Sequence, residues 1–420
     1  MIRLDDLLAG TGGTLLGEAV ARLFADFSYD SRTLAPGALF VALVTETGDG
    51  HDHIPAALHA GAAGLLCERA PAELPPGVAC VLVPNTQQAL LDYARYILRA
   101  RHIDVVAVTG SVGKTSTKEA IAAVLGQRLR VFRSPGNYNG RLGLPISLGR
   151  LEDDQTVAVL EIASDALGEV GDLAEAARPR VGVVTAVGAS HLQVFGTVES
   201  TAQEKAALVR ALPPGGVAVL NWDDPRVRAM AGETQARVVA WSARAEGDLP
   251  PGGDLPAGAL RASEVTVTRQ GTAVTVEHAG ARHRLEIPLI GAQHAGTVLA
   301  ASAVGLAFGL SWEEISAGLR QVAPLPGRTR LLAGAGGAEL LDDSYNASPE
   351  SLVAALGTLA ALEARRRVVV LGDMAELGPL TEEAHGAAAR GIAGVADLLV
   401  TIGDLAGLAA EAALQGGLAP

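Results

Sequence analysis

The 420-residue sequence predicts an α/β protein with more than one domain. From residue 104 onward, short apolar runs alternate with longer amphipathic stretches, a pattern typical of a mostly parallel sheet flanked by helices. The 50 glycines and 21 prolines supply the many tight turns that this alternation requires. Because a single hydrophobic core rarely extends beyond about 250–300 residues, the length indicates two or three domains.

The first hundred residues mix short strands with helices. A domain boundary is expected near residue 100, because the chain then passes through His102 and Asp104 into a new apolar strand. The expected elements before it are strands at 38–44 and 78–84, a helix that begins at 54 and runs through Gly61 into a strand ending at 68, and an amphipathic helix at 86–100.

The next segment, VVAVTGSVGKTSTKE, predicts a phosphate-binding loop between a strand and a helix. Gly110 and Gly113 allow the tight turn in which backbone N–H groups face an anion. Lys114 adds a charge for the outer phosphates of a nucleoside triphosphate, and Thr115 offers a hydroxyl to Mg²⁺ at the positive end of the following helix. Val108 stands where the Walker pattern has glycine, so the loop has the shorter T-G-x-x-G-K-T form. An ordinary strand-to-helix turn is the alternative.

The rest of the chain continues the alternation, apart from one antiparallel part. Residues 235–290 hold strings such as EVTVTRQGTAVTVEH, with Gly271 at a hairpin turn, and predict a small antiparallel insertion or sheet edge. Residues 322–329, VAPLPGRT, are expected to form a linker. The other expected elements are strands at 156–161, 181–188 and 217–221, helices at 199–212 and 294–309, and three late strands, AELLDDS, RVVVLGDM and DLLVTIGD, each running into Gly or Asp as in an open α/β sheet.

The composition disfavours several classes of protein. The net charge of −13 argues against a general nucleic-acid binder, and the 3% aromatic content against stacking platforms for single strands. Cys67 and Cys80 lie in apolar contexts and are expected to be buried thiols in a reducing compartment. The N-terminus does not read as a signal peptide, and no apolar run approaches about 18 residues. A cytoplasmic protein is therefore expected.

Three residues after the phosphate loop are candidates for metal chemistry. Glu161 ends a strand at the carboxyl edge of the predicted sheet, where a carboxylate can bind Mg²⁺; a solvated strand-end acid is the alternative. His191 follows the next strand by a short turn, and a plain loop histidine is an equal interpretation. Lys205 lies in a predicted helix and by itself reads as a surface lysine.

Two polar segments are candidates for substrate contact. Asn137 and Asn139 lie in the glycine-rich loop SPGNYNGRLGLPISL, where amide groups can contact a substrate; a plain turn is the alternative. Arg328 follows the linker and can contact phosphate. A polar cluster at a strand end indicates either a site or an Asx-capped turn: Asp342, Asp343, Ser344, Tyr345 and Asn346.

Together these segments resemble the Mur ligases, the ATP-dependent peptide-forming enzymes of peptidoglycan precursor synthesis, over nearly the whole chain. TGSVGKTS resembles their phosphate loop, and GNYNGRLGLP, LLDDSYNASPESL and LGDMAELG resemble further motifs. YDSRTLAPGALFVAL and GDGHDHIPAAL resemble the first domain of the family. The resemblance implies a small α/β UDP-sugar-binding domain (1–100), a central parallel-sheet P-loop ATPase domain with an antiparallel insertion (101–323) and a C-terminal Rossmann-like domain (324–420).

The resemblance also implies the roles of individual residues. Lys205 matches the lysine that the family carbamylates with carbon dioxide, which turns a cation into an anionic oxygen ligand. The implied catalytic residues are Lys114, His191, Lys205, Asn137 and Asn139, and the implied magnesium ligands are Thr115, Glu161, His191 and Lys205. The implied contacts to ATP are Gly110, Ser111, Gly113, Lys114, Thr115, Ser116, His294, Arg328, Asp343, Tyr345 and Asn346. The implied contacts to the UDP-sugar are Asp30, Ser31, Arg32, His51 and Asp52.

The implied reaction is amide formation at the expense of ATP. The motifs DDSYNASP and GDMAELG are similar to those of members that join D-alanyl-D-alanine to UDP-N-acetylmuramoyl-tripeptide through an acyl phosphate. A monomer that binds only small molecules is expected. Several positions depart from the family. Ala186 and Ala295 stand where asparagine is usual, and the second asparagine typically serves the adenine; Gly140 and Arg141 stand where asparagine and an acid are common, and VLEIAS replaces VLEMGA.

Several alternatives stay open on the sequence. A ligase of the same family could add a different amino acid, or the chain could resemble a folylpolyglutamate synthetase, although that enzyme lacks a UDP-binding module. A P-loop ATPase or kinase that drives a partner's motion would turn over ATP without a UDP-sugar. A nucleotide-binding module would bind ATP without turnover.

Overall fold

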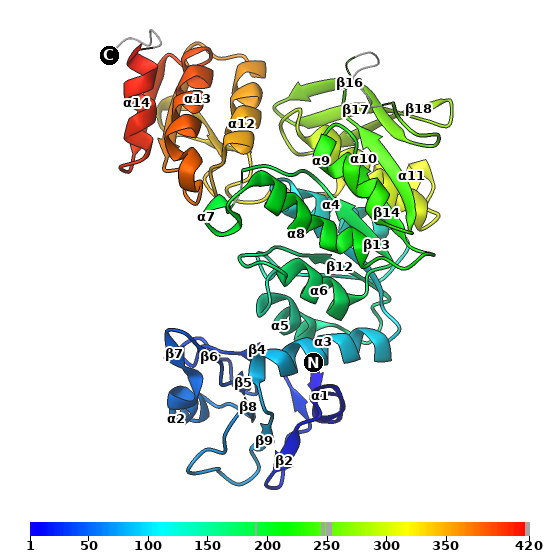
Figure 1. Cartoon of the computed structure of the whole chain (residues 1–420), viewed down its shortest axis with the longest axis vertical. Helices are drawn as coiled ribbons and strands as arrows, with labels where there is room; N and C mark the ends of the chain where they lie inside the picture. Colours follow the sequence, from blue (N-terminus) through cyan, green and yellow to red (C-terminus); the bar gives the residue numbers. More distant parts are fainter. Residues whose placement is uncertain (190, 245–247, 249–253, 416–420) are drawn as a thin grey trace. The chain divides into compact units, whose positions relative to one another are not determined.

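The computed structural model describes residues 1–189, 191–244, 248 and 254–415, and its chain divides into two compact units. Helices alternate with strands along most of it (Figure 1), which confirms the predicted α/β class. Unit 1 comprises Met1–Ala107, Leu129–Ser164 and Gly168–Arg180, and unit 2 comprises Val108–Arg128, Asp165–Leu167 and Val181–Pro420. The domain boundaries expected at residues 100 and 323 stay predictions.

Unit 1 contains a five-stranded sheet in the order β2-β9-β8-β5-β4. Strands β4, β5, β8 and β9 run parallel, and β2 is antiparallel to β9. The predicted burial of both cysteines is confirmed, because the thiols of Cys67 and Cys80 lie 3.5 Å apart in the core beside this sheet. The first elements are β1 (Ile2–Arg3), α1 (Leu4–Thr11), β2 (Thr14–Leu16), β3 (Leu23–Phe24), β4 (Phe27–Ser28), β5 (Leu39–Val41), β6 (Val44–Thr45), β7 (Gly48–Asp49), α2 (Ile54–His59), β8 (Gly64–Cys67), β9 (Ala79–Leu82) and α3 (Thr86–Ala100).

Helix α3 spans the range that the sequence predicts, since Asn85 caps it by accepting a 2.8 Å hydrogen bond from the Gln88 N–H. The predicted continuation of a helix through Gly61 is wrong. Helix α2 ends at His59, because Gly61 has φ of 93°, a value that a right-handed helix does not permit. The remaining elements of unit 1 are β11 (Val131–Arg133), α5 (Gly143–Ser147), β12 (Val157–Glu161), parallel to β11, and α6 (Glu169–Ala177).

Strand β10 (Asp104–Thr109) lies at the division between the two units. In unit 2, strands β13, β14, β15 and β16 run parallel, so β15 lies outside the antiparallel part although the predicted range of 235–290 includes it. Strands β16, β17 and β18 are antiparallel and form one edge of their sheet, with Gly271 directly after the hairpin turn. The elements up to this point are α4 (Lys114–Leu125), β13 (Val181–Val184), α7 (Leu192–Phe195), α8 (Val198–Arg210), β14 (Val217–Asn221), α9 (Pro225–Ala229), β15 (Arg237–Ser242), β16 (Leu260–Thr268), β17 (Gly271–His278) and β18 (Ala281–Ile287).

Helix α10 (His294–Ala307) forms the core of unit 2. Eleven of its residues are buried, and it packs against α4 and strands β14 to β17. A helix that is apolar on every side is stable only when it is buried on every side. His294, its first residue, is 6% exposed, and this burial lowers the pKa of the imidazole from 6.5 to about 4.

Helix α11 (Trp312–Arg320) packs against α4, the helix that follows the phosphate loop. The two backbones come unusually close at Gly318. A Cβ atom there would lie 2.5 Å from the Val124 Cα and 2.7 Å from the Ala123 carbonyl oxygen. The close packing of α11 against α4, the helix that begins at Lys114, therefore requires glycine at position 318.

We call residues 327–415 the C-terminal segment. It contains a parallel pair, β21 (Val368–Gly372) and β22 (Leu398–Ile402), packed against α12 (Pro349–Ala361), α13 (Thr381–Ala393) and α14 (Ala406–Gln415) (Figure 1). The expected third strand of this sheet is elsewhere. Strand β20 (Glu339–Asp342) pairs antiparallel with β19 (Arg330–Ala333) in a separate hairpin. Gly336 and Gly337, with positive φ, allow the tight reversal that pairs β20 with its neighbour in sequence.

No helix of the described ranges is both long enough and apolar enough to cross a bilayer.

We expect His294 to make the stability of the protein pH-dependent. Between pH 6.5 and 4 this histidine is protonated in the unfolded chain but stays neutral in the folded chain. The free energy of unfolding therefore decreases as the pH is lowered through this range and reaches its full value only above pH 6.5. From pH 7 to pH 5 the wild type should lose about 2 kcal/mol more than His294→Gln. Urea unfolding at both pH values measures this, and equal losses in the two proteins would contradict it.

We expect Gly318→Ala to destabilise the protein by about 1–3 kcal/mol, because the added methyl group meets the backbone of α4. Gly357→Ala is the matched control: this glycine is exposed within α12 and a Cβ there meets nothing within 4 Å. The control should be neutral or stabilising by about 0.5–1 kcal/mol. Thermal unfolding compares the two variants, and a neutral Gly318→Ala would refute the close approach.

Candidate active site

The phosphate loop follows β10 and is shaped by two glycines with positive φ. Gly110 has φ of 143°, and a Cβ atom there would lie 2.1 Å from Oγ1 of Thr185, the residue directly after β13. The Thr185 hydroxyl donates to the Val112 carbonyl at 2.6 Å. Gly113 has φ of 83° and immediately precedes α4, so the amino end of this helix opens at the loop. The geometry is that of an anion-binding turn.

The lysine of the loop lies against the loop backbone. Lys114 Nζ donates to the carbonyl oxygens of Gly110 at 2.8 Å and Ser111 at 3.2 Å. Its side chain is half-buried, as are Thr115 and Ser116. A bound phosphate presents stronger acceptors than these carbonyls, so the ammonium group can exchange one set of partners for the other.

A second loop lies against the phosphate loop; we call it the histidine loop and define it as residues 185–189 and 191–193. Ser111 connects the two: its N–H donates to the Ala186 carbonyl at 2.7 Å and its Oγ accepts from the Gly188 N–H at 2.9 Å. The strand predicted to reach residue 188 therefore ends at Val184, because the following backbone groups bond to the phosphate loop.

His191 is a 29%-exposed side chain at the start of α7, with a left-handed backbone (φ of 55°). Its Nδ1 lies 2.6 Å from Glu376 Oε2 and 3.8 Å from Asp165 Oδ1. The histidine is therefore in contact with a carboxylate of the C-terminal segment.

Lys205 is buried in α8 at 3% exposure, with Nζ 5.6 Å from the centre of the Phe195 ring. The interpretation as a surface lysine is wrong. Placing an ammonium group away from water costs free energy, so such a position is rarely occupied by lysine without a function or a strong partner. Its burial makes the implied chemistry of this residue worth testing.

A hydrogen bond joins Glu161 and Asn139, which both belong to unit 1. Glu161 is 2% exposed, its Oε1 accepts from Asn139 Nδ2 at 2.8 Å, and its N–H donates to Ser134 Oγ at 3.1 Å. A solvated strand-end acid is therefore excluded. Asn137, two residues earlier, is exposed.

Some residues of the polar cluster in the C-terminal segment remain candidates for a site, and others belong to a turn. The Arg328 guanidinium lies 3.9 Å from the centre of the exposed Tyr345 ring. Asp343 accepts from the Thr329 N–H at 2.9 Å and hydroxyl at 3.1 Å, and burial raises the pKa of its carboxyl despite these bonds. Asn346 is exposed. The Asp342 carboxylate accepts from the Gly327 N–H at 3.0 Å and from the Ser344 hydroxyl at 2.7 Å, and only the second bond is local, as in the predicted capped turn.

The residues implied to contact a UDP-sugar differ in accessibility. The Asp30 carboxylate accepts from Arg32 Nε at 2.9 Å and Nη2 at 2.7 Å, which lowers the pKa of Asp30 to about 2. Arg32 and Asp52 are exposed, and Ser31 is half-buried. His51 is 8% exposed; its Nδ1 lies 2.6 Å from Asp49 Oδ1 and its Nε2 accepts from the Glu68 N–H at 2.9 Å. Both ring nitrogens are thus used inside unit 1.

Ala186 and Ala295 stand where asparagine is usual in the family. Ala186 contributes its carbonyl to Ser111. Ala295 is 1% exposed in α10, next to His294, whose Nε2 is buried without a hydrogen-bond partner among the described residues.

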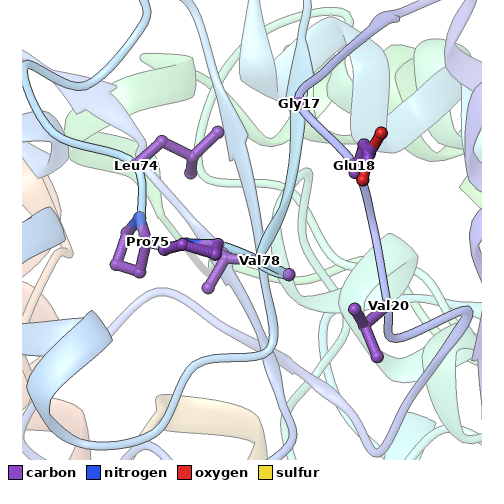
Figure 2. A pocket seen from close by; sticks show the side chains of 8 residues that line it. Gly17, Glu18, Val20, Leu74, Pro75 and Val78 are labelled. Atoms are coloured by element: carbon purple, nitrogen blue, oxygen red, sulfur yellow. The ribbon is translucent and has the colours of Figure 1, made fainter.

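Within the described ranges no cluster of three or more His, Cys, Asp or Glu side chains forms a metal site by itself. A cavity of about 430 Å³ lies in unit 1 (Figure 2), but none of the predicted site residues lines it. Its walls are Gly17, Glu18, Val20, Leu74, Pro75, Pro76, Gly77 and Val78. Glu18 is its one ionisable side chain, so the cavity has no set of groups for phosphate chemistry.

Sequence reasoning missed three residues that contact these loops: Thr185, Glu350 and Glu376. Thr185 is a polar residue at the end of an apolar strand, a signal that the sequence does contain. Glu376 lies inside the motif LGDMAELG, but the motif does not indicate which residue it contacts. Glu350 accepts from the Ala189 N–H at 2.8 Å, and no spacing in the sequence predicts that pairing.

Three family descriptions match this chain in order. "Mur ligase family, catalytic domain" matches residues 26–131, "Mur ligase middle domain" residues 108–305, and "Mur ligase, glutamate ligase domain" residues 327–418. A relative from Bacillus subtilis, named UDP-N-acetylmuramoyl-tripeptide–D-alanyl-D-alanine ligase, is 33% identical over 388 residues, 92% of this chain and 81% of the relative.

Solved structures agree with this relationship. The structure titled crystal structure I of MurF from Acinetobacter baumannii has a TM-score of 0.86 at 27% identity and covers 98% of this chain and 88% of that one. MurF ligase from Thermotoga maritima, solved in complex with ADP, has a TM-score of 0.79 at 27% identity, over 91% of this chain and 86% of that one. The three-domain α/β organisation implied by the motifs is that of these structures, and the chain belongs to the Mur ligase family.

Proposed function

We propose that this protein is an ATP-dependent ligase that joins D-alanyl-D-alanine to UDP-N-acetylmuramoyl-tripeptide. The observation that carries the proposal is the phosphate loop, in which Gly110, Lys114 and the amino end of α4 form an anion-binding turn beside a loop that carries His191. The relative that is named for this reaction matches along 92% of the chain, so the resemblance extends far beyond the loop.

In this proposal ATP binds with its outer phosphates on the phosphate loop. The N–H groups of the loop and Lys114 neutralise the charge of the β- and γ-phosphates, with Ser111, Gly113, Thr115 and Ser116 around them. His294, Arg328, Asp343, Tyr345 and Asn346 are the further contacts that we propose for the nucleotide. The Arg328 guanidinium, stacked on Tyr345, is a rigid donor for phosphate oxygen or for the base.

We propose Thr115, Glu161, His191 and a carbamylated Lys205 as the ligands of Mg²⁺. The hydroxyl, the carboxylate and a carbamate are hard oxygen donors of the kind that this ion prefers, and the buried Glu161 is held in one orientation by Asn139. Mg²⁺ would neutralise charge on the transferred phosphoryl group. A carbamate at Lys205 would turn this buried ammonium group into an oxygen ligand, whose charge the bound Mg²⁺ would balance.

The proposed reaction has two steps. A carboxylate oxygen of the tripeptide attacks the γ-phosphorus, the bond to ADP breaks, and an acyl phosphate forms. The neutral amine of D-alanyl-D-alanine then attacks the acyl carbon, the carbon–oxygen bond to phosphate breaks, and the nitrogen loses a proton, so the products are the amide and HPO₄²⁻. The protein contributes position and charge: Lys114 holds the phosphates, and Asn137 and Asn139 orient the reacting groups.

The remaining contacts belong to the same proposal. Asp30, Ser31, Arg32 and Asp52 would bind the UDP-sugar, and His51 would support them from within the domain, because both of its ring nitrogens already have partners. The substrates are small molecules, and we propose a cytoplasmic monomer.

The test is ADP release by the purified protein with its substrates offered singly and together. ADP should appear only with ATP, UDP-N-acetylmuramoyl-tripeptide and D-alanyl-D-alanine together, and Lys114→Ala should lower the rate by at least about 100-fold, because the phosphates lose their charged donor. Turnover without the UDP-sugar would favour an ATPase, and ATP binding without any turnover a binding module. Faster turnover with another amino acid would favour a different ligase of the family.

The carbamate can be tested directly, because the chain has only three lysines, Lys114, Lys118 and Lys205. In ¹³C-bicarbonate we expect one carbamate resonance in the wild-type protein, and its loss together with activity in Lys205→Ala. Lys114→Ala is the matched control, since it should lose turnover and keep the resonance. A resonance that persists in Lys205→Ala would assign the modification elsewhere, and a fully active Lys205→Ala would end the proposed role.

A further inference from the structure

The C-terminal segment holds the histidine loop through two glutamates that the reaction scheme above does not use. Glu350 lies in the first turn of α12, which Ser348 caps, and Glu376 lies between β21 and α13. The two are 26 positions apart in sequence but contact neighbouring parts of one loop.

Glu350 contacts the backbone of the loop. Its Oε1 accepts from the Ala189 N–H at 2.8 Å, and a Cβ atom at Gly188 would lie 2.3 Å from the same oxygen. Its Oε2 is buried without a hydrogen-bond partner among the described residues. On the opposite side, Gly188 bonds to Ser111 of the phosphate loop. Gly188 therefore lies between the Glu350 carboxylate and Ser111 of the phosphate loop.

Glu376 contacts the loop with both its backbone and its side chain. Its carbonyl accepts from the Gln193 N–H at 3.1 Å, and its Oε2 lies 2.6 Å from His191 Nδ1. Its φ of 64° is a left-handed conformation that costs free energy in a residue other than glycine. Such a conformation persists when the surrounding contacts hold it, and here those contacts are with the histidine loop.

Apolar packing joins the same two parts. Ala189 packs against a cluster of the C-terminal segment whose buried members are Met374, Leu377, Ala384 and Ala388. Met374 and Leu377 lie on either side of Glu376 in sequence. The polar contacts of Glu376 with the loop are therefore made next to this apolar contact. The loop is therefore seated on the C-terminal segment.

We propose that Glu350 and Glu376 are positioning residues that set the histidine loop, and with it His191, from the C-terminal segment. The inference rests on the proposed role of His191 as a magnesium ligand. A histidine that donates its Nδ1–H to a carboxylate has its Nε2 lone pair directed away from that carboxylate and available to a metal. Glu376 orients the ring in this way, and Glu350 fixes the backbone just before it.

The experiment compares Glu350→Ala and Glu376→Ala with the conservative variants Glu350→Gln and Glu376→Gln, whose amide oxygens can still accept. Glu382→Ala is the matched control, because Glu382 is likewise an acid in the first turn of a helix of the same segment, but exposed. The Mg²⁺ concentration for half-maximal ADP release and the KM for ATP and D-alanyl-D-alanine are measured for each, with thermal unfolding to confirm folding.

We expect each alanine variant to raise the required Mg²⁺ concentration by about 10-fold or more, as loss of a group that orients a metal ligand does. The KM for D-alanyl-D-alanine should change little, and the glutamine variants and Glu382→Ala should stay near the wild type. In ¹⁵N NMR spectra, Glu376→Ala should also lose the predominance of the His191 tautomer with hydrogen on Nδ1, which a merely structural role would not predict.

His191→Ala separates the two proposals. If His191→Ala needs no more Mg²⁺ than the wild type, the metal role in the proposed function fails. If His191→Ala is impaired while Glu350→Ala and Glu376→Ala have a normal magnesium requirement and an unchanged His191 tautomer, the positioning role is overturned and the proposed function stands.

Discussion

The active-site candidate depends on the close approach between the phosphate loop and the end of β13. At Gly110 the gap to the Thr185 hydroxyl leaves no room for a side chain, and Ser111 joins the two loops through its hydrogen bonds to Ala186 and Gly188. The glycine is therefore required for two reasons, the positive φ and the missing Cβ. Because the histidine loop starts at this contact, the packing of Gly110 fixes where that loop begins.

Burial of charged and titratable groups is the second constraint. Glu161, Lys205 and His294 are each at most 6% exposed, and each would be more stable in water unless a partner or a ligand compensates. Glu161 has its amide partner and His294 is held neutral by its low pKa. Groups with such environments collect at functional sites, since a low local dielectric strengthens their interaction with a charged ligand.

The C-terminal segment has a dual relationship to the rest of unit 2. It carries Arg328 and Asp343, which the family resemblance assigns to the nucleotide, and it also contacts the histidine loop through Glu350 and Glu376. In the proposed function, this segment would bind ATP and also hold the loop that carries His191.

The sequence by itself determined the elements that local rules control. The N-cap and the amphipathic pattern predict helix α3, the glycines predict the phosphate loop, and Gly271 predicts the hairpin. Each of these depends on residues only a few positions apart. Tertiary structure alone decided that Lys205 is buried, that β20 pairs with β19 and that Glu376 lies beside His191. Burial and long-range pairing depend on groups distant in sequence, and a charged residue in an amphipathic helix has the same pattern whether it faces water or a site.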